Sequence, residues 1–419
     1  MKRIDVVVIG AGQAGLAMSG SLTARNIGHV VLERGRIGER WRSERWHSLR
    51  LLTPASHSAL PGLPHAGVDG DFFLPAGDFA DYLDAYAGYA RAPVIPHSAV
   101  LAVAPCADGY RTTSASGAWQ SRAVVIATGD CDTPSRPACA AALPPAIMQV
   151  APRDYRSPAE LPDGAVLIVG ASSTGVQLAE EIHASGRPVT IAVGTHTRLP
   201  RRYRGLDIFA AMDRAGILDD LAETNPGIDA ARRQPSSQLA GRVDWRDIDL
   251  AVLQAQGVRL TGRLAAIDGT RVRFRDDLLL TTAAAHERMV RTLNRIDAAI
   301  DPGEGRPVPA IAPFIVASDI GELDLAKEGL RTVIWATGYV RRYPWLRVPI
   351  LDGRGEIEHR GGITPAPGVY VMGLRYMRRR RSHFISGCGM DAEDLAQDIA
   401  AHLGAKAPAV KAPTTRWRW

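Results

Sequence analysis

The sequence has few cysteines, and no two of them are spaced as a redox pair. Four cysteines occur in 419 residues, and none forms a Cys-x-x-Cys motif. An enzyme that reduces disulfides through its own thiols uses such a pair. Thiol–disulfide chemistry is therefore not predicted. The histidines are scattered, with no ligand spacing beside the cysteines, so we predict no metal site either.

Long apolar runs are also missing. No segment reaches the roughly 18 to 20 apolar residues that span a bilayer. Residues 1–9 superficially resemble a secretion signal, because basic residues precede a short apolar run. Asp5 interrupts that run, which leads into a glycine-rich turn instead of a small-residue cleavage site. We therefore expect a cytoplasmic protein with no membrane partner.

The charge excess is small. Lys plus Arg exceeds Asp plus Glu by 50 to 44, a net charge of +6, and the arginines form only short clusters. A protein that binds a nucleic acid usually carries a broad basic patch. Nucleic-acid binding is therefore not predicted.

Two glycine-rich turns each follow an apolar run. Val6–Ile9 leads into GAGQAG, with Gly10, Gly12 and Gly15 in the dinucleotide-binding spacing. In such a turn the first glycine allows the tight bend, the second lets a pyrophosphate approach, and the third lets helix and strand pack closely. The unpaired N–H groups of the helix that follows point at the pyrophosphate.

The second turn differs from the first at its middle position. Residues 166–169 lead into GASSTG, where Gly170 and Gly175 stand at the ends and Ser172 replaces the middle glycine. Serine is small enough for the phosphates still to approach. Ser173 and Thr174 complete this predicted site.

The residues beyond each turn predict which dinucleotide binds there. Glu33 closes the apolar run after the first turn, and an acid at this point accepts hydrogen bonds from a ribose with free hydroxyls. We assign this turn to FAD. The run after the second turn has no acid and continues into a basic loop that could contact a 2′-phosphate, so we assign it to NADPH. The candidate phosphate contacts in this loop are His196, Arg198, Arg201 and Arg202.

Two strands end in the same three residues. Ala127-Thr128-Gly129 and Ala336-Thr337-Gly338 each close an apolar run, and small residues there let a backbone approach a cofactor. The pair brackets the second turn, so we predict an α/β fold of two Rossmann-like dinucleotide-binding domains, with the NADPH domain inserted into the FAD domain. The predicted boundaries are 1–156 for the first part of the FAD domain, 157–335 for the NADPH domain with a helical insertion, and 336–419 for the closing part.

The motifs together resemble the class B flavin-containing monooxygenases, bacterial branch. The resemblance covers nearly the whole chain and rests on both turns, Glu33, the GERWR segment with Trp41, and the paired strand ends. It implies that NADPH reduces FAD and that one oxygen atom of O2 enters a small organic substrate by N-, S- or Baeyer–Villiger oxygenation. No triad or carboxylate pair is evident, so no catalytic residue is assigned. The remaining predicted cofactor-binding residues are Arg34, Trp41, Thr53, Thr128, Gly129, Gly338, His383 and Phe384.

One segment departs from the family. Its fingerprint, F-x-G-x-x-x-H-x-x-x-[F/W], should precede the second turn, yet alignment on Tyr155 places Pro145, Ile147 and Ala151 at the Phe, Gly and His positions. The missing histidine predicts that reducing equivalents are lost as peroxide, and that Ala151→His improves coupling. Two alternatives stay open: an FAD-dependent NADPH oxidoreductase or dehydrogenase without oxygen insertion, and a non-catalytic flavoprotein. The sequence determines neither the substrate nor the oligomeric state.

Overall fold

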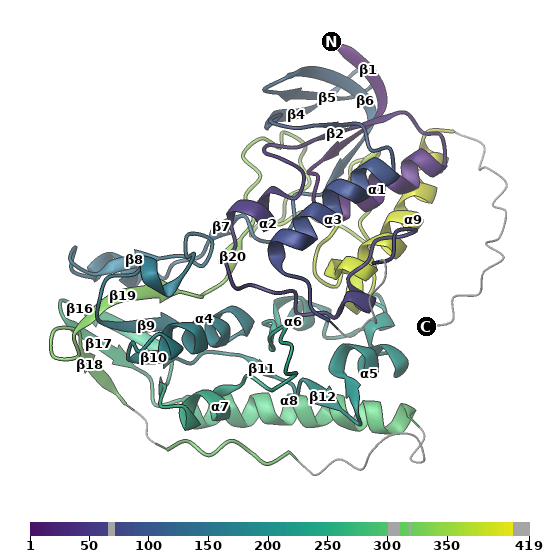
Figure 1. Ribbon diagram of the computed structural model, residues 1–419. Coiled ribbons are helices and arrows are strands. Elements are labelled where there is room, and N and C mark those ends of the chain that lie inside the picture. The colour runs from purple at the N-terminus through teal and green to yellow at the C-terminus, as the bar shows by residue number, and fades with distance from the viewer. Residues whose placement is uncertain (66–71, 301–310, 318–319, 405–419) are drawn as a thin grey trace.

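The computed structural model describes residues 1–65, 72–300, 311–317 and 320–404. The described chain forms two α/β bodies, which are the upper and lower halves of Figure 1. Each body is built on its own sheet. Each sheet contains one of the two apolar strands that lead into a glycine-rich turn.

The first sheet has seven strands in the order β3-β2-β1-β6-β5-β4, with β21 also paired to β6. The apolar half of β1, Val6–Ile9, is buried and pairs in parallel with β2 and β6. β4, β5 and β6 form an antiparallel meander. The strands are β1 (Lys2–Ile9), β2 (His29–Leu32), β3 (Val94–Ile95), β4 (Val100–Cys106), β5 (Gly109–Ser114), β6 (Gly117–Ile126) and β21 (Val369–Val371).

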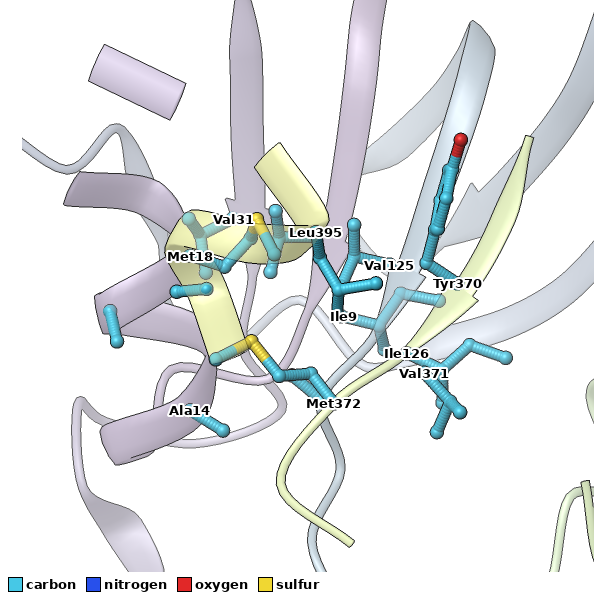
Figure 2. Packing of buried hydrophobic residues seen from close by; sticks show 14 of the residues in the cluster. Ile9, Ala14, Met18, Val31, Val125, Ile126, Tyr370, Val371, Met372 and Leu395 are labelled. Atoms are coloured by element: carbon cyan, nitrogen blue, oxygen red, sulfur yellow. The ribbon is translucent and has the colours of Figure 1, made fainter. Parts of the chain in front are cut away.

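Helices α1 (Gln13–Ala24), α3 (Ala76–Tyr89) and α9 (Ile385–His402) cover one face of this sheet (Figure 1). Figure 2 shows how they close the core, with Met18 of α1 and Leu395 of α9 beside strand residues Val31 and Val125. All four side chains are buried. The closing segment after residue 336 therefore completes the first body, as an inserted second domain requires.

The second sheet has five parallel strands in the order β15-β10-β9-β19-β8. Its strands are β8 (Met148–Val150), β9 (Ala165–Val169), β10 (Val189–Ala192), β15 (Arg259–Thr261) and β19 (Leu330–Trp335). Helix α4 (Ser173–Ala184) starts from the second turn, after β9. The predicted boundary at residue 156 stays a prediction, although β8, which precedes it, belongs to this second sheet.

A two-stranded ribbon connects the two bodies. β7 (Thr133–Pro134) leaves the first body just after one Ala-Thr-Gly ending, and β20 (Tyr339–Val340) returns just after the other. The two strands pair antiparallel, so the outgoing and returning chains lie side by side. The α/β fold with two Rossmann-like domains, one inserted in the other, is confirmed.

The remaining elements extend the second body, except α2 and η1 near the first turn and η5 before α9. No helix within the described ranges is long and apolar enough to cross a membrane. The remaining strands are β11 (Thr197–Arg198), β12 (Arg202–Tyr203), β13 (Leu206–Asp207), β14 (Ser237–Gln238), β16 (Leu264–Asp268), β17 (Arg271–Phe274) and β18 (Glu322–Asp324). The remaining helices are α2 (Glu39–Ser43), α5 (Ile208–Arg214), α6 (Ile228–Arg233), α7 (Leu250–Ala255), α8 (Leu278–Ala299), η1 (Ala55–His57), η2 (Ala138–Ala142), η3 (Pro158–Glu160), η4 (Ile217–Asp219) and η5 (Arg380–His383).

Candidate functional site

The first turn has the geometry of a dinucleotide cradle. Gly10 has φ +107°, where L side chains are strained, and a Cβ on Gly15 would lie 1.8 Å from the Gly10 carbonyl oxygen. A Cβ on Gly12, by contrast, would meet no atom within 4 Å. Gly10 and Gly15 are therefore required by the fold itself. Gly12 keeps open the space that a pyrophosphate needs.

Glu33 lies at the end of this cradle. Its two carboxylate oxygens accept hydrogen bonds from the backbone N–H groups of Ala11, at 2.7 Å, and Gly35, at 2.9 Å. These bonds fix the carboxylate beside the turn, and the side chain is largely buried. A carboxylate oxygen has further lone pairs, so Glu33 can still accept from a ribose hydroxyl.

A cavity of about 640 Å³ runs from Glu33 past the first turn to the start of α9. An elongated cavity with an acid at one end and an open glycine along it fits FAD. The predicted residues that line it are Gly10, Gly12, Glu33, Arg34, Trp41, Thr128, Gly129 and His383. Gly15 lies behind the turn, where it lets α1 approach β1.

Four charged side chains beside this cavity form a network that sequence reasoning missed. Arg40 donates to the Thr128 carbonyl oxygen at 2.8 Å and to Asp132 at 3.1 Å. Arg153, on the crossing to the second body, donates to the Glu44 carboxylate at 2.8 Å. The network thus ties the edge of the FAD cavity to the crossing segment. Its members are far apart in sequence, and their spacing carries no motif.

His383 also lines this cavity. Burial lowers its pKa to about 3, and the nearby positive charge of Arg375 adds to that effect. Its Nδ1 atom has no hydrogen-bond partner. The imidazole is therefore neutral near pH 7 and holds an unpaired polar atom beside the cavity. Its flavin-side role stays a prediction.

Three predicted cofactor contacts do not line this cavity. Thr53 hydrogen-bonds Ser58 at 2.7 Å, oxygen to oxygen. The Phe384 ring packs edge-on against Phe209, with ring centroids 5.4 Å apart. Gly338, at φ +88°, accepts a hydrogen bond from the backbone of the connecting ribbon. All three predictions assume that residues close in sequence to the flavin segments also contact the flavin. In the structure, these three residues contact neighbouring protein atoms instead of lining the cavity.

The second turn repeats the backbone of the first. Gly170 has φ +110°, and a Cβ on Gly175 would lie 1.9 Å from the Gly170 carbonyl oxygen. Ser172 caps α4 with φ −82° and ψ −174°, against −84° and −172° for Gly12 before α1. This match shows that the second turn is also built for a dinucleotide.

A segment of the insertion lies over this second turn. Gln238 donates its amide to the Ala171 carbonyl oxygen at 2.7 Å, and the Ser173 hydroxyl donates to Leu239 at 3.3 Å. The Gln238 amide oxygen is buried without a partner. The Ser173 side chain therefore anchors this segment, while Ser172 and Thr174 are only partly buried and remain predicted NADPH contacts.

The basic loop after β10 does not present its charges as predicted. Arg201 is 1% exposed and forms an ion pair with Asp207. His196 is 2% exposed, and burial lowers its pKa. Arg198 forms an ion pair with Asp249 at 2.8 Å. Arg202 is exposed, and its guanidinium lies 4.7 Å from the Trp245 ring centroid. The assignment of Arg201 to a 2′-phosphate is wrong, because its guanidinium is sealed in the core, and buried His196 is a poor candidate for the same reason.

Arg201 instead joins the two bodies. It donates to the Leu52 carbonyl oxygen at 2.8 Å, and its guanidinium lies 4.9 Å from the Phe73 ring centroid. Nearby, a Cβ on Gly241 would lie 2.1 Å from the Leu51 carbonyl oxygen, so the backbones touch. Such contacts hold the second domain against the first.

Arg375 makes a further bridge between the bodies. It lines the FAD cavity and donates to the Gln234 carbonyl oxygen at 2.7 Å and to the Ser236 hydroxyl at 2.9 Å. The segment it holds continues to Gln238 at the second turn. This segment is therefore hydrogen-bonded to a residue of the FAD cavity at one end and to the second turn at the other.

Known proteins share this arrangement along almost the whole chain. A family model described as pyridine nucleotide-disulphide oxidoreductase matches residues 7–204. A CzcO-like oxidoreductase of Geobacillus kaustophilus is 30% identical over 402 residues, which are 95% of this chain and 99% of that protein. The chain belongs to the CzcO-like oxidoreductases. The chain is also similar to indole-3-pyruvate monooxygenase YUCCA1 of rice. The two are 29% identical over 94% of this chain and 90% of the rice protein.

Solved structures show the same fold. A flavin-containing monooxygenase from Stenotrophomonas maltophilia matches with a TM-score of 0.68 at 20% identity, covering 96% of this chain and all of that one. The resemblance to flavin-containing monooxygenases that the sequence motifs predict is confirmed. This CzcO-like protein is a flavin-dependent oxidoreductase, and the predicted cofactors, FAD and NADPH, are those of its family.

Proposed function

We propose that this protein is an NADPH-dependent FAD monooxygenase that transfers one oxygen atom from O2 to a small organic substrate. The observation that carries the proposal is the pair of matching dinucleotide turns, held in one assembly by buried contacts between the bodies. The balanced reaction converts substrate, O2, NADPH and H⁺ into oxygenated substrate, NADP⁺ and water. The names of the rice and Stenotrophomonas proteins support the same class of reaction.

The cofactors supply the redox chemistry when bound, and the protein supplies binding and enclosure. Gly12 and Glu33 would hold the pyrophosphate and adenosine ribose of FAD, while Ser172 and the α4 N-terminus would hold the pyrophosphate of NADPH. His383 is neutral and can exchange a hydrogen bond at the buried end of the cavity. Arg375 and Arg201 would keep the two sites in fixed relation.

The cysteines support oxygenation over disulfide reduction. Cys131 lines the FAD cavity, and all four cysteines are free. Without a partner thiol, Cys131 cannot form the internal disulfide that a dithiol mechanism passes electrons through. Free cysteines are also usual in the reducing cytosol, so a cytoplasmic location is part of the proposal.

A second candidate function is NADPH oxidation without oxygen insertion. Ala151 favours it, because this fully buried alanine stands where the family fingerprint has a histidine. The two candidates differ in their products under ¹⁸O2. Oxygenation predicts one ¹⁸O atom per product molecule across a panel of amines, sulfides and ketones, with NADPH use matching product. NADPH use that yields only labelled peroxide or water, with every substrate of the panel unlabelled, would support the second candidate.

A further inference from the structure

The position after β10 that would distinguish NADPH from NADH carries no acidic or other polar side chain. Val193 follows β10 as Glu33 follows β2, and their backbone N–H groups make equivalent hydrogen bonds to the neighbouring strand, at 3.0 and 3.1 Å. Val193 is fully buried and apolar, and the next residue is Gly194. Neither residue has a side chain that could accept from a free 2′-hydroxyl or repel a 2′-phosphate.

Arg263 reaches this place from the next strand of the sheet. β15 pairs in parallel with β10, so Arg263, two residues beyond β15, emerges at the same carboxyl edge. Its guanidinium donates to the Thr195 hydroxyl at 2.9 Å. A Cβ on Gly194 would lie 3.9 Å from the Arg263 Nε atom, so the guanidinium lies directly beside this glycine.

Arg263 is also free enough to bind an anion. Its side chain is 41% exposed, and its ion pair with Asp277 is long, at 3.5 Å. Two of the three predicted arginines of the basic loop form ion pairs elsewhere, Arg201 with Asp207 and Arg198 with Asp249. The third, Arg202, is exposed and stacks on the Trp245 ring. Arg288 of α8 donates to the His196 carbonyl oxygen at 2.6 Å and so holds the loop in place from its other side.

We propose that Arg263, with the Thr195 hydroxyl, binds the 2′-phosphate of NADPH, and that Arg288 is a positioning residue for this site. A guanidinium matches phosphate oxygens two at a time, and the Thr195 hydroxyl beside it can donate to a third. The inference rests on the proposed function only in that NADPH must bind at the second turn. In this proposal, one arginine at the end of a neighbouring strand provides the preference for NADPH that the sequence assigned to the basic loop.

Calorimetry on the FAD-loaded protein tests this without measuring turnover. Arg263→Gln should weaken binding of NADP⁺ and 2′,5′-ADP about ten- to a hundred-fold, since one charge-assisted contact is lost. Binding of NAD⁺ and 5′-AMP should change less than about twofold. Arg263→Lys keeps the charge without the planar fork and should fall in between. The matched control is Arg291→Gln, because Arg291 lies on α8 one turn from Arg288 and is 67% exposed.

The outcomes separate the inference from the cofactor assignment. A wild-type protein that binds NAD⁺ as tightly as NADP⁺ would overturn both. A wild-type protein that prefers NADP⁺, with the preference kept in Arg263→Gln, would overturn the inference alone. Equal loss for both nucleotides, or equal loss in Arg291→Gln, would also overturn it. Inorganic phosphate that competes equally well against NADP⁺ and NAD⁺ would show that the bound anion is not the 2′-phosphate.

Discussion

The two glycine-rich turns have nearly the same backbone and quite different surroundings. Both bend at a glycine near φ +110° and both start a helix, so the sequence motif determines the same local geometry twice. Beyond the first turn, Glu33 is fixed by backbone N–H groups and remains able to accept a hydrogen bond. Beyond the second, the expected ligand Arg201 is buried with Asp207. The turn fixes where a pyrophosphate lies, and residues outside the motif fix which nucleotide it belongs to.

The largest effect is expected at Arg201. Replacing it by glutamine leaves Asp207 buried without its ion-pair partner, and breaking such a pair costs about 3–5 kcal/mol. The free energy of unfolding, measured by denaturant titration, should fall by that amount while the ratio of NADP⁺ to NAD⁺ affinity stays unchanged. A stable Arg201→Gln protein with lost NADP⁺ preference would restore the loop as the phosphate site. Arg202→Gln, an exposed neighbour, is the matched control.

Acid sensitivity should come in part from His383. Its pKa in the folded protein, about 3, lies below the ordinary value of 6.5, so the unfolded chain binds the proton more readily. Stability from this group is therefore present above about pH 6.5 and is lost as pH falls, by up to about 1.4 kcal/mol per pH unit. His383→Gln should flatten the dependence of unfolding free energy on pH between 6.5 and 4.5 by about one proton. Identical slopes in the two proteins would mean that His383 titrates normally.

Gly12 and Ser172 offer a direct comparison of the turns. A methyl group at Gly12 meets no protein atom but enters the space for a pyrophosphate, so Gly12→Ala should keep its stability and lose about 1–3 kcal/mol of FAD affinity. Ser172→Gly, the matched change in the second turn, should leave FAD binding within about 0.5 kcal/mol. Equilibrium dialysis of flavin measures both. FAD affinity unchanged in Gly12→Ala would place the cofactor elsewhere.

The last effect concerns the crossing segment. Ala151 is fully buried, and a histidine there has no free volume, so overpacking should cost about 1–3 kcal/mol. The sequence resemblance predicts instead that Ala151→His improves coupling of NADPH use to oxygenation. Unfolding midpoints and the peroxide formed per NADPH distinguish the two. A variant as stable as wild type that releases less peroxide would support the resemblance over the packing argument.

The sequence predicts the backbone of both sites because their local chemistry is self-contained. A strand, three small residues at fixed spacing and a helix define each cradle without help from the rest of the chain. Glu33 also lies next to its own strand, so its position follows from the same short segment. The insertion of one domain in the other follows from the paired strand ends, which the connecting ribbon confirms.

Charge partners are harder to predict from the sequence. Whether Arg198 is free depends on Asp249, and whether Arg375 faces flavin or protein depends on Gln234 and Ser236. These contacts join segments that only the folded topology brings together. Arg263 is the opposite case: no motif marks it in the sequence, and the pairing of β15 with β10 brings it close to Gly194. A cluster of arginines in sequence therefore does not establish a phosphate site.

The central claim is that the first turn holds FAD and the second holds NADPH so that one reduces the other. Anaerobic titration of the FAD-loaded protein, followed by flavin absorbance, tests it most directly. One equivalent of NADPH should bleach the flavin, and NADH should need roughly tenfold or higher concentration, the preference expected from a charge-assisted phosphate contact. A flavin that NADPH does not bleach, or that both nucleotides bleach equally at the same concentration, would contradict the account.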